Sequence, residues 1–447
     1  MLQLPSLSLD LGFGRRRSGT TDVVGLDVQP GLAAAVKVRV NGSIRAERAV
    51  LRPLDADTMR EGEVVDPETL GQALRELFDE GNLGKRVRVG IANQRSVMRT
   101  IELPPITDRK ELAAAVAFQA QDQVPMPLSN AVLDFHPLGI SDTPTGPRQR
   151  VVLVAAQRDM VERLLSAVRL AGLTPVGVDL SAFALIRSLV RRDEGDDQRV
   201  LYLNVDGLTN LAIADGEICR FTRVVGGGVE AMASELASRR GIALVEARAL
   251  LASVDLGAPA PDAALEQPPA PVAAAAPEHD ASAEAPSALA EVAESDDPAG
   301  YEQPAGDGEP VAESSLSREE HEAREASMGF REAMEHAKAP VAEQAPAPAA
   351  SSEDIRLVLE NGVRELTGEI RNSLDFHRTQ NQGGEISHVS LSGAALDLPG
   401  FVQALQDSLG MEVRGEAVGF IDESLNGEVS AHRLSVAAGL ATEEAPR

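Results

Sequence analysis

Residues 23–28, VVGLDV, begin a pattern that the chain repeats at residues 200–205, VLYLNV. In each copy a short loop and a second apolar strand follow, and a polar turn then leads into a third strand. The two turns, Asn41-Gly42 and Asp215-Gly216, suit the positive φ angles of a type I′ hairpin. An apolar strand that ends in an acidic or amide side chain beside a small loop can offer backbone N–H groups to a phosphate. We therefore predict two similar lobes that face each other across a nucleotide cleft.

Length and composition limit the classes of protein to which the chain can belong. Its 447 residues suffice for two or three domains. The net charge of −27 argues against nucleic acid as a partner, because binding to a phosphate backbone depends on clustered Lys and Arg. The single cysteine, Cys219, excludes an intramolecular disulfide and a cysteine metal cluster, and we expect it to be an inert core residue.

The sequence predicts neither a membrane-spanning helix nor a targeting signal. No run approaches the roughly 20 apolar residues that a membrane-spanning helix needs. The basic residues 15–17 follow the N-terminal apolar residues instead of preceding them, so we expect no signal peptide. The expected location is the cytoplasm.

The order of predicted elements divides the chain into two lobes. We expect a flexible tail over residues 1–21, a first lobe over 22–198 and a second lobe over 199–447. Within the first lobe, residues 107–169 have the order β-α-β-β-α, which predicts a small inserted α+β subdomain. Residues 257–352 are dominated by Ala, Pro and Glu, and they predict a long disordered acidic insert, because such a segment cannot bury enough apolar surface to offset chain entropy.

Order returns at Asp354, where apolar residues at helical spacing predict a long amphipathic helix. A buried strand over residues 389–391 then runs into Ser392-Gly393. A closing helix begins near residue 436, and we expect it to pack back on the first lobe.

Residues at the ends of the predicted strands are the candidate phosphate and nucleotide contacts. Asp27 ends the first strand of one lobe, and Asn204 and Asp206 end the equivalent strand of the other. Residues 226–228 are three glycines before a helix N-terminus, where free N–H groups and the helix dipole favour an anion. Ser392-Gly393 allows close approach of the backbone.

Several other chemistries find no support in the sequence. There is no Gly-x-x-x-x-Gly-Lys-Ser/Thr run of a P-loop enzyme and no His-Glu-x-x-His zinc motif. Ser390 and Ser392 lie near His388, but nothing arranges them as a nucleophile elbow. We predict no catalytic residue.

Three longer stretches resemble the PilM family of type IV pilus assembly proteins, in the actin, Hsp70 and sugar-kinase superfamily. In the first, residues 101–104, IELP, precede the helix 111–116, ELAAAV, and then 124–128, VPMPL, and 132–135, VLDF. The second stretch runs from VAA at 154–156 through AGL at 171–173 to VD at 178–179, and the third is LTGEIRNSLDF at 366–376.

The resemblance implies an α/β protein of two actin-like (ribonuclease H-like) lobes, with the small subdomain in lobe one and the disordered insert in lobe two. It implies ATP with Mg²⁺ between the lobes. It also implies binding of the N-terminal cytoplasmic peptide of PilN, in a groove shaped partly by residues 107–169. Such a protein would join the PilN/PilO inner-membrane platform to the pilus motor side, and would meet the inner face of the membrane only through its partners.

Four departures from the family pattern predict weak nucleotide binding or a scaffold that no longer binds nucleotide. Asp27 is followed by Val-Gln-Pro-Gly, and the proline removes a backbone donor. The second lobe has Asn204 where the family usually has an aspartate that orients the metal. This carboxylate is lost unless Asp206 takes its role. Ser392-Gly393 is followed by two alanines in place of paired glycines, and the helix from Glu246 ends in leucine instead of lysine. The candidate nucleotide contacts are Asp27, Asn204, Asp206, Gly207, Thr209, Gly226, Gly227, Gly228, Glu246, Ser392 and Gly393, with Asp27 and Asp206 as candidate Mg²⁺ ligands.

Three functions remain open at this point. The first is an adaptor, at most a weak ATPase, whose lobes hold a partner peptide. The second is an actin-superfamily ATPase or small-molecule kinase, which would need a carboxylate base in the cleft. We find no convincing base after the first-lobe hairpin. The third is an actin-like filament former, whose polymer interface the acidic insert would crowd.

Overall fold

The computed structural model describes residues 23–41, 43–144, 146–191, 198–258, 352–380, 384–422 and 429–442. The expected tail over residues 1–21 and nearly all of the expected insert over 257–352 lie outside these described residues.

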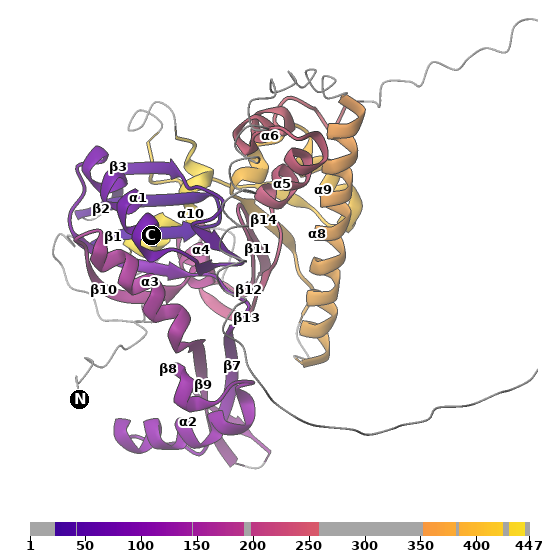
Figure 1. Cartoon of the computed structure of the whole chain (residues 1–447). Helices are drawn as coiled ribbons and strands as arrows, with labels where there is room; N and C mark the ends of the chain where they lie inside the picture. Colours follow the sequence, from indigo (N-terminus) through magenta and orange to yellow (C-terminus); the bar gives the residue numbers. More distant parts are fainter. Residues whose placement is uncertain are drawn as a thin grey trace, which may run out of the picture. The chain divides into compact units, whose positions relative to one another are not determined.

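The first lobe is built on a five-stranded sheet with the order β10-β6-β1-β2-β3 (Figure 1). The first three strands along the chain form an antiparallel meander, and the other two run parallel to β1. β1 carries the apolar run that opens the sequence pattern, and all of its residues are buried. The strands are β1 (Val23–Gln29), β2 (Leu32–Asn41), β3 (Ser43–Pro53), β6 (Arg86–Ile91) and β10 (Thr174–Leu180).

The second lobe repeats this sheet, in the order β13-β12-β11-β14-β15. Again three strands form an antiparallel meander and two more run parallel to the first of them. The identical order and direction of five strands confirm the predicted duplication. The strands are β11 (Arg199–Val205), β12 (Thr209–Asp215), β13 (Ile218–Val225), β14 (His388–Ser392) and β15 (Val413–Gly415).

Helices cover both sheets, and their apolar positions supply the cores. In the first lobe α1 begins at a capping carboxylate, since Asp66 accepts hydrogen bonds from two backbone N–H groups. Its buried leucines share one core with α3, α4 and α10. In the second lobe α5, α6, α8 and α9 pack on the same core as β11 and β14. The helices are α1 (Pro67–Glu80), α3 (Arg158–Leu170), α4 (Ser181–Leu189), α5 (Val229–Arg240), α6 (Leu244–Leu251), α8 (Ser352–Gln380), α9 (Phe401–Leu409) and α10 (Ser435–Ala441).

The closing helix α10 lies against β1 and α4 of the first lobe, where two glycines permit close approach. A Cβ added at Gly25 would lie 2.0 Å from the carbonyl oxygen of Ala437, and one at Gly439 would lie 1.8 Å from that of Ala184. Only glycine fits at such distances, so these backbones are in direct contact.

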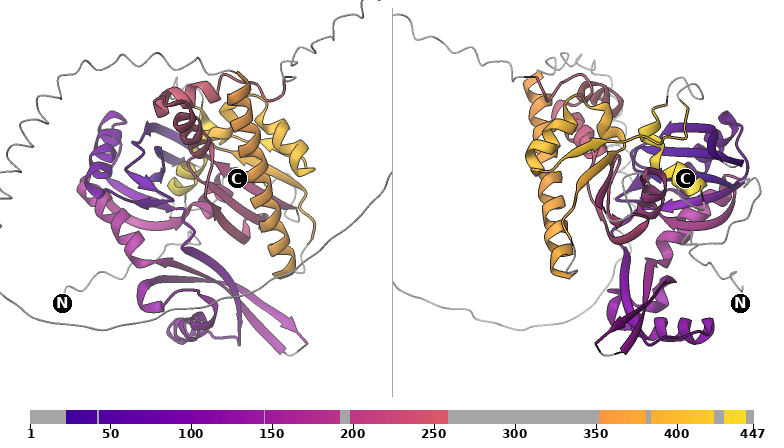
Figure 2. Two further views of the ribbon diagram at one scale, coloured as in Figure 1. Left: turned by 45° about the vertical axis from the view of Figure 1, so that its right-hand side comes forward. Right: turned by 180° about the vertical axis from the view of Figure 1, so that it is seen from behind.

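A three-stranded sheet with the order β7-β9-β8 carries α2 on one face (Figure 2). Val116 and Ala120 of α2 pack on Leu153 and its neighbours in β9. Two elements depart from the subdomain expected over residues 107–169. The strand β7 belongs to this small sheet but precedes that segment. The helix α3 lies inside the segment but packs on α1 in the core of the first lobe. The elements are β7 (Ser96–Leu103), α2 (Arg109–Gln123), β8 (Ala131–Thr143) and β9 (Gly146–Gln157).

Short elements complete the described chain. They are the two-stranded pair β4 (Met59–Arg60) and β5 (Glu63–Val64), and the 3₁₀ turns η1 (Leu128–Asn130), η3 (Ala394–Asp397) and η5 (Ala431–Leu434). Among the helices of the described ranges, none is both long and apolar enough to cross a membrane.

Candidate functional site

The loops after β1 and β11, which the sequence pattern singled out, lie directly against each other. The β1–β2 turn consists of Pro30 and Gly31, and Gly31 has a φ of +78°. A Cβ added at Gly207, in the β11–β12 loop, would lie 2.0 Å from the carbonyl oxygen of Pro30. In addition, the Leu208 N–H donates to Oε1 of Gln29 at 3.5 Å. The two lobes therefore meet through backbone contacts at the predicted phosphate loops.

A cavity of about 300 Å³ opens beside these loops. This size is at the small end of ligand pockets, which span roughly 300–1,000 Å³. Residues of both lobes line the cavity, and its charged members come from the second lobe. They are Asp206, Glu230, Arg248, Asp397 and Arg433.

Asp206 is bound on both carboxylate oxygens by groups of the protein itself. Its Oδ1 accepts the Ala394 N–H at 2.6 Å, and its Oδ2 accepts from Nδ2 of Asn204 at 2.8 Å. The Oδ1 of Asn204 accepts in turn from the Ser392 hydroxyl at 3.0 Å. Burial raises the pKa of Asp206, and the Arg433 charge and the two hydrogen bonds oppose this rise. This carboxylate therefore holds the loop after β14.

Asp27 has a different environment at the end of β1. Its Oδ2 accepts from Nε2 of Gln29 at 2.7 Å, and its Oδ1 has no hydrogen-bond partner among the described residues. Burial raises the pKa of Asp27 to about 7, the Gln29 hydrogen bond lowers it, and the nearby Asp206 charge raises it. A buried carboxylate with an unsatisfied oxygen favours its neutral form.

The remaining charges of the cavity are paired with each other. Nε of Arg248 donates to Oε2 of Glu230 at 2.9 Å, and a second guanidinium nitrogen bonds the other carboxylate oxygen. Asp397 lies 2.7 Å from Nε2 of His432 and 3.6 Å from Nε of Arg433. Three carboxylates and two guanidinium groups line the cavity, so they add no free positive charge for a phosphate.

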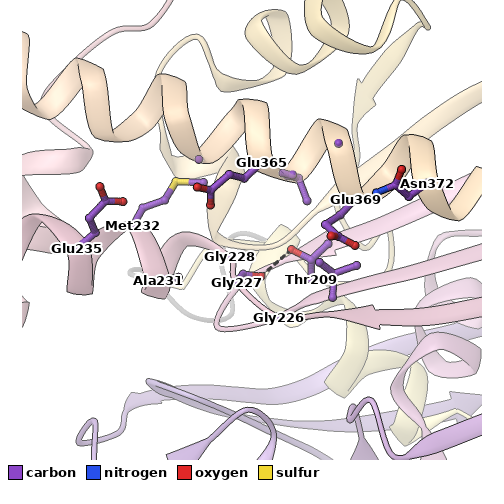
Figure 3. Close-up of a pocket in the computed structure, with 14 residues that line it drawn as sticks. Thr209, Gly226, Gly227, Gly228, Ala231, Met232, Glu235, Glu365, Glu369 and Asn372 are labelled. Atoms are coloured by element: carbon purple, nitrogen blue, oxygen red, sulfur yellow. Dashed lines mark hydrogen bonds between the residues drawn. The ribbon is translucent and has the colours of Figure 1, made fainter. Parts of the chain in front are cut away.

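Nine of the eleven predicted site residues fall into two groups, and the backbone of Gly228 in the second group abuts that of Asp206 in the first. Asn204, Asp206, Gly207, Ser392 and Gly393 come together at the junction of the lobes. Four others line a different cavity of about 420 Å³ between α5 and α8 of the second lobe (Figure 3). These four are Thr209, Gly226, Gly227 and Gly228.

The second cavity has an acidic rim. Figure 3 shows Glu365 and Glu369 of α8 above the glycine loop, with Glu235 of α5 to one side. The Thr209 hydroxyl donates to the Gly227 carbonyl at 3.0 Å, so it supports the glycine loop.

Glu246 lines neither cavity and is exposed on the first turn of α6. Two residues that sequence reasoning missed, Glu230 and Arg248, line the interlobe cavity instead. A signal for Glu230 existed, because it follows the glycine triplet in the first turn of a helix. No local pattern marks Arg248 as its partner.

The loops after β1 and β11 do not fit a magnesium–triphosphate group. Pro30 has no N–H, the Asp206 N–H donates to the Leu208 carbonyl at 3.1 Å, and the Leu208 N–H is bonded to Gln29. Triphosphate sites depend on free backbone N–H groups and unpaired cations. Within the described ranges, no group of three or more His, Cys, Asp or Glu residues is placed to hold a metal ion.

Comparison with known proteins places these features in a family context. The family model described as type IV pilus assembly protein PilM matches residues 25–259. The solved structure of a PilM–PilN type IV pilus biogenesis complex is 21% identical, with 95% of this chain and 98% of that chain covered and a TM-score of 0.63. MreB5 of Spiroplasma citri bound to ADP is 11% identical over 93% of this chain and 94% of that chain, with a TM-score of 0.45. The ethanolamine utilization protein EutJ from Carboxydothermus hydrogenoformans is 12% identical over 94% and 88%, with a TM-score of 0.41.

Proposed function

The chain belongs to the PilM family of type IV pilus assembly proteins, and from this premise we propose that it works as a partner-binding adaptor. It is an actin-like α/β protein of the pilus assembly machinery. The observation that carries the adaptor proposal is the interlobe cavity, where the Leu208 N–H, the Ala394 N–H and the Arg248 guanidinium are already bonded to the protein. Because these donors are not available to a nucleotide, we favour binding to another protein as the function.

The proposed partner is the N-terminal cytoplasmic peptide of PilN. A chain of the same fold has been solved in a PilM–PilN complex, which supports this choice. Through PilN the protein would join the PilN/PilO platform to the motor side of the machinery. We propose that it lies at the inner face of the cytoplasmic membrane and is held there by its partners.

The small subdomain offers apolar surface for such a peptide. Phe118 on α2 is 72% exposed and Ile140 on β8 is 62% exposed, and aromatic side chains are enriched at protein–protein interfaces. The outer strand β8 is poorly suited to pairing with another strand. Its Phe135 N–H is bonded to the Asp134 carboxylate, and Pro137 has no N–H. The peptide would therefore be held mainly by side-chain contacts.

Fluorescence anisotropy with a labelled peptide of the PilN N-terminus tests this proposal. We expect saturable binding by the full chain, and an affinity loss of about tenfold in Phe118→Ser or Ile140→Ser, the size of a moderate interface contact. Val245→Ser is the matched control, because Val245 is 70% exposed on α6 of the second lobe. Absence of binding at high micromolar protein would refute the adaptor proposal.

An ATPase or small-molecule kinase of the actin superfamily is the rival function. Either enzyme needs groups that hold a triphosphate and its Mg²⁺. We propose weak ATP affinity, with turnover slower than about one per second, the low end of usual enzyme rates. Calorimetry with Mg-ATP and a phosphate-release assay decide between the adaptor and the enzyme, because tight binding with fast phosphate release supports the enzyme.

A further inference from the structure

We propose that the Glu230 carboxylate substitutes for a bound anion and latches the two lobes together. The latch consists of Glu230 and Arg248 in the second lobe and the Pro30-Gly31 turn in the first lobe. This inference concerns the protein's own closure and does not depend on the identity of its partner.

The first-lobe side of the latch is the contact at Gly31. A Cβ added at Gly31 would lie 2.6–2.8 Å from the carboxylate carbon and oxygens of Glu230. The carboxylate therefore lies on the backbone of the β1–β2 turn, where the sequence pattern predicted a phosphate. A side chain larger than hydrogen at Gly31 would displace it.

The second-lobe side fixes the position of that carboxylate. Arg248 of α6 bonds both oxygens of Glu230, and paired charge-assisted bonds of this kind hold the carboxylate plane in one orientation. Glu230 also lies in the first turn of α5, where the helix dipole stabilises a negative charge. Its side chain is 16% exposed and that of Arg248 is 25% exposed, so water screens the pair only in part.

Two neighbouring contacts belong to the same closure. The Pro30 carbonyl abuts Gly207, and Gln29 accepts the Leu208 N–H. Both contacts join the lobes through protein atoms alone. A latch made of the chain's own residues explains how the cleft can close although the Leu208 and Ala394 N–H groups are not free for a nucleotide.

The latch differs from an ordinary surface ion pair, and this difference supplies a matched control. Arg223 and Glu369 form a pair at 3.0 Å between β13 and α8, entirely within the second lobe. Removing the Glu369 charge should leave the junction of the lobes unchanged. Glu369→Gln therefore reports the effect of losing one carboxylate without loss of the latch.

Hydrogen exchange of the full chain, followed by mass spectrometry, tests the latch. In Glu230→Ala we expect exchange about tenfold faster in peptides covering residues 27–33 and 205–209, with the α1 core peptide unchanged as proof of folding. Glu230→Gln keeps the side-chain shape and should give a smaller increase in the same two peptides. Glu369→Gln should match the wild type.

The same experiment with millimolar Mg-ATP separates the latch from a nucleotide-closed cleft. We expect the two wild-type peptides to exchange equally with and without Mg-ATP. Slower wild-type exchange on adding Mg-ATP would overturn the proposal, because nucleotide would then close the lobes. Unchanged exchange in both Glu230 variants would also overturn it.

Discussion

Asp27 lies near the end of β1 and Asp206 directly follows the equivalent strand β11, yet the two buried carboxylates differ in their hydrogen bonds. Asp206 has both oxygens bonded, one to a backbone N–H and one to an amide. Asp27 has one oxygen bonded and one unsatisfied. The duplicated sheets thus keep the strand order but give each carboxylate a different role. In the second lobe it is a structural acceptor, and in the first it is a buried acid that tends to remain neutral.

The largest expected effect concerns Asp27→Asn, whose unfolding free energy should differ from that of the wild type by an amount that depends on pH. A folded-state pKa of about 7 against 3.8 means that the folded wild type keeps a proton that the unfolded chain releases. Its unfolding free energy therefore falls as pH rises from about 4 to 7, by roughly 4 kcal/mol at about 1.4 kcal/mol per pKa unit. Asparagine does not titrate. The unfolding free energy of the variant should therefore rise relative to that of the wild type as the pH increases over this range.

Denaturant unfolding of both proteins at several pH values measures that gain. The comparison of the two carboxylates would fail if the stability difference stayed constant between pH 4 and 8.

A second test concerns the contact between the two equivalent loops. Gly207→Ala places a Cβ within 2.0 Å of the Pro30 carbonyl, so we expect a loss of up to about 3 kcal/mol in unfolding free energy. Gly368→Ala on α8 is the control, because no atom lies within 4 Å of its added Cβ. It should be neutral or stabilise the helix by about 0.5–1 kcal/mol. Equal melting temperatures for Gly207→Ala and the wild type would show that the loops do not touch.

The smallest effect is expected for Asp206→Asn. The amide keeps one acceptor oxygen but presents N–H groups where Ala394 or Asn204 donates. We expect a loss of about 2 kcal/mol, the range for a hydrogen bond to a charged group. Chemical denaturation at pH 7 measures it. A variant as stable as the wild type would mean that Asp206 is not the structural acceptor.

Local patterns sufficed to predict the two meanders and most helices. The turns at Asn41 and Asp215 connect the predicted strands, and Asp66 caps a helix that Pro67 opens. The grouping of the smaller sheet could not be read in this way. The strand β7 pairs with β9 across a connection of many residues, which no local periodicity reveals.

For the contacts of the candidate site, the sequence indicated only one of the two partners. Asp206 and Ser392 stood out as polar ends of buried strands, whereas the Ala394 N–H that Asp206 accepts is 188 residues away in the chain. Glu230 and Arg248 had no polar strand end to mark them. Their pairing depends on how α5 and α6 pack, which is a tertiary property.

The most direct test of the account is the affinity of the full chain for the PilN N-terminal peptide, measured by calorimetry with and without Mg-ATP. A protein that closes on its own residues should bind the peptide equally well, within about twofold, in both conditions. Binding that appears only when Mg-ATP is present would contradict the account.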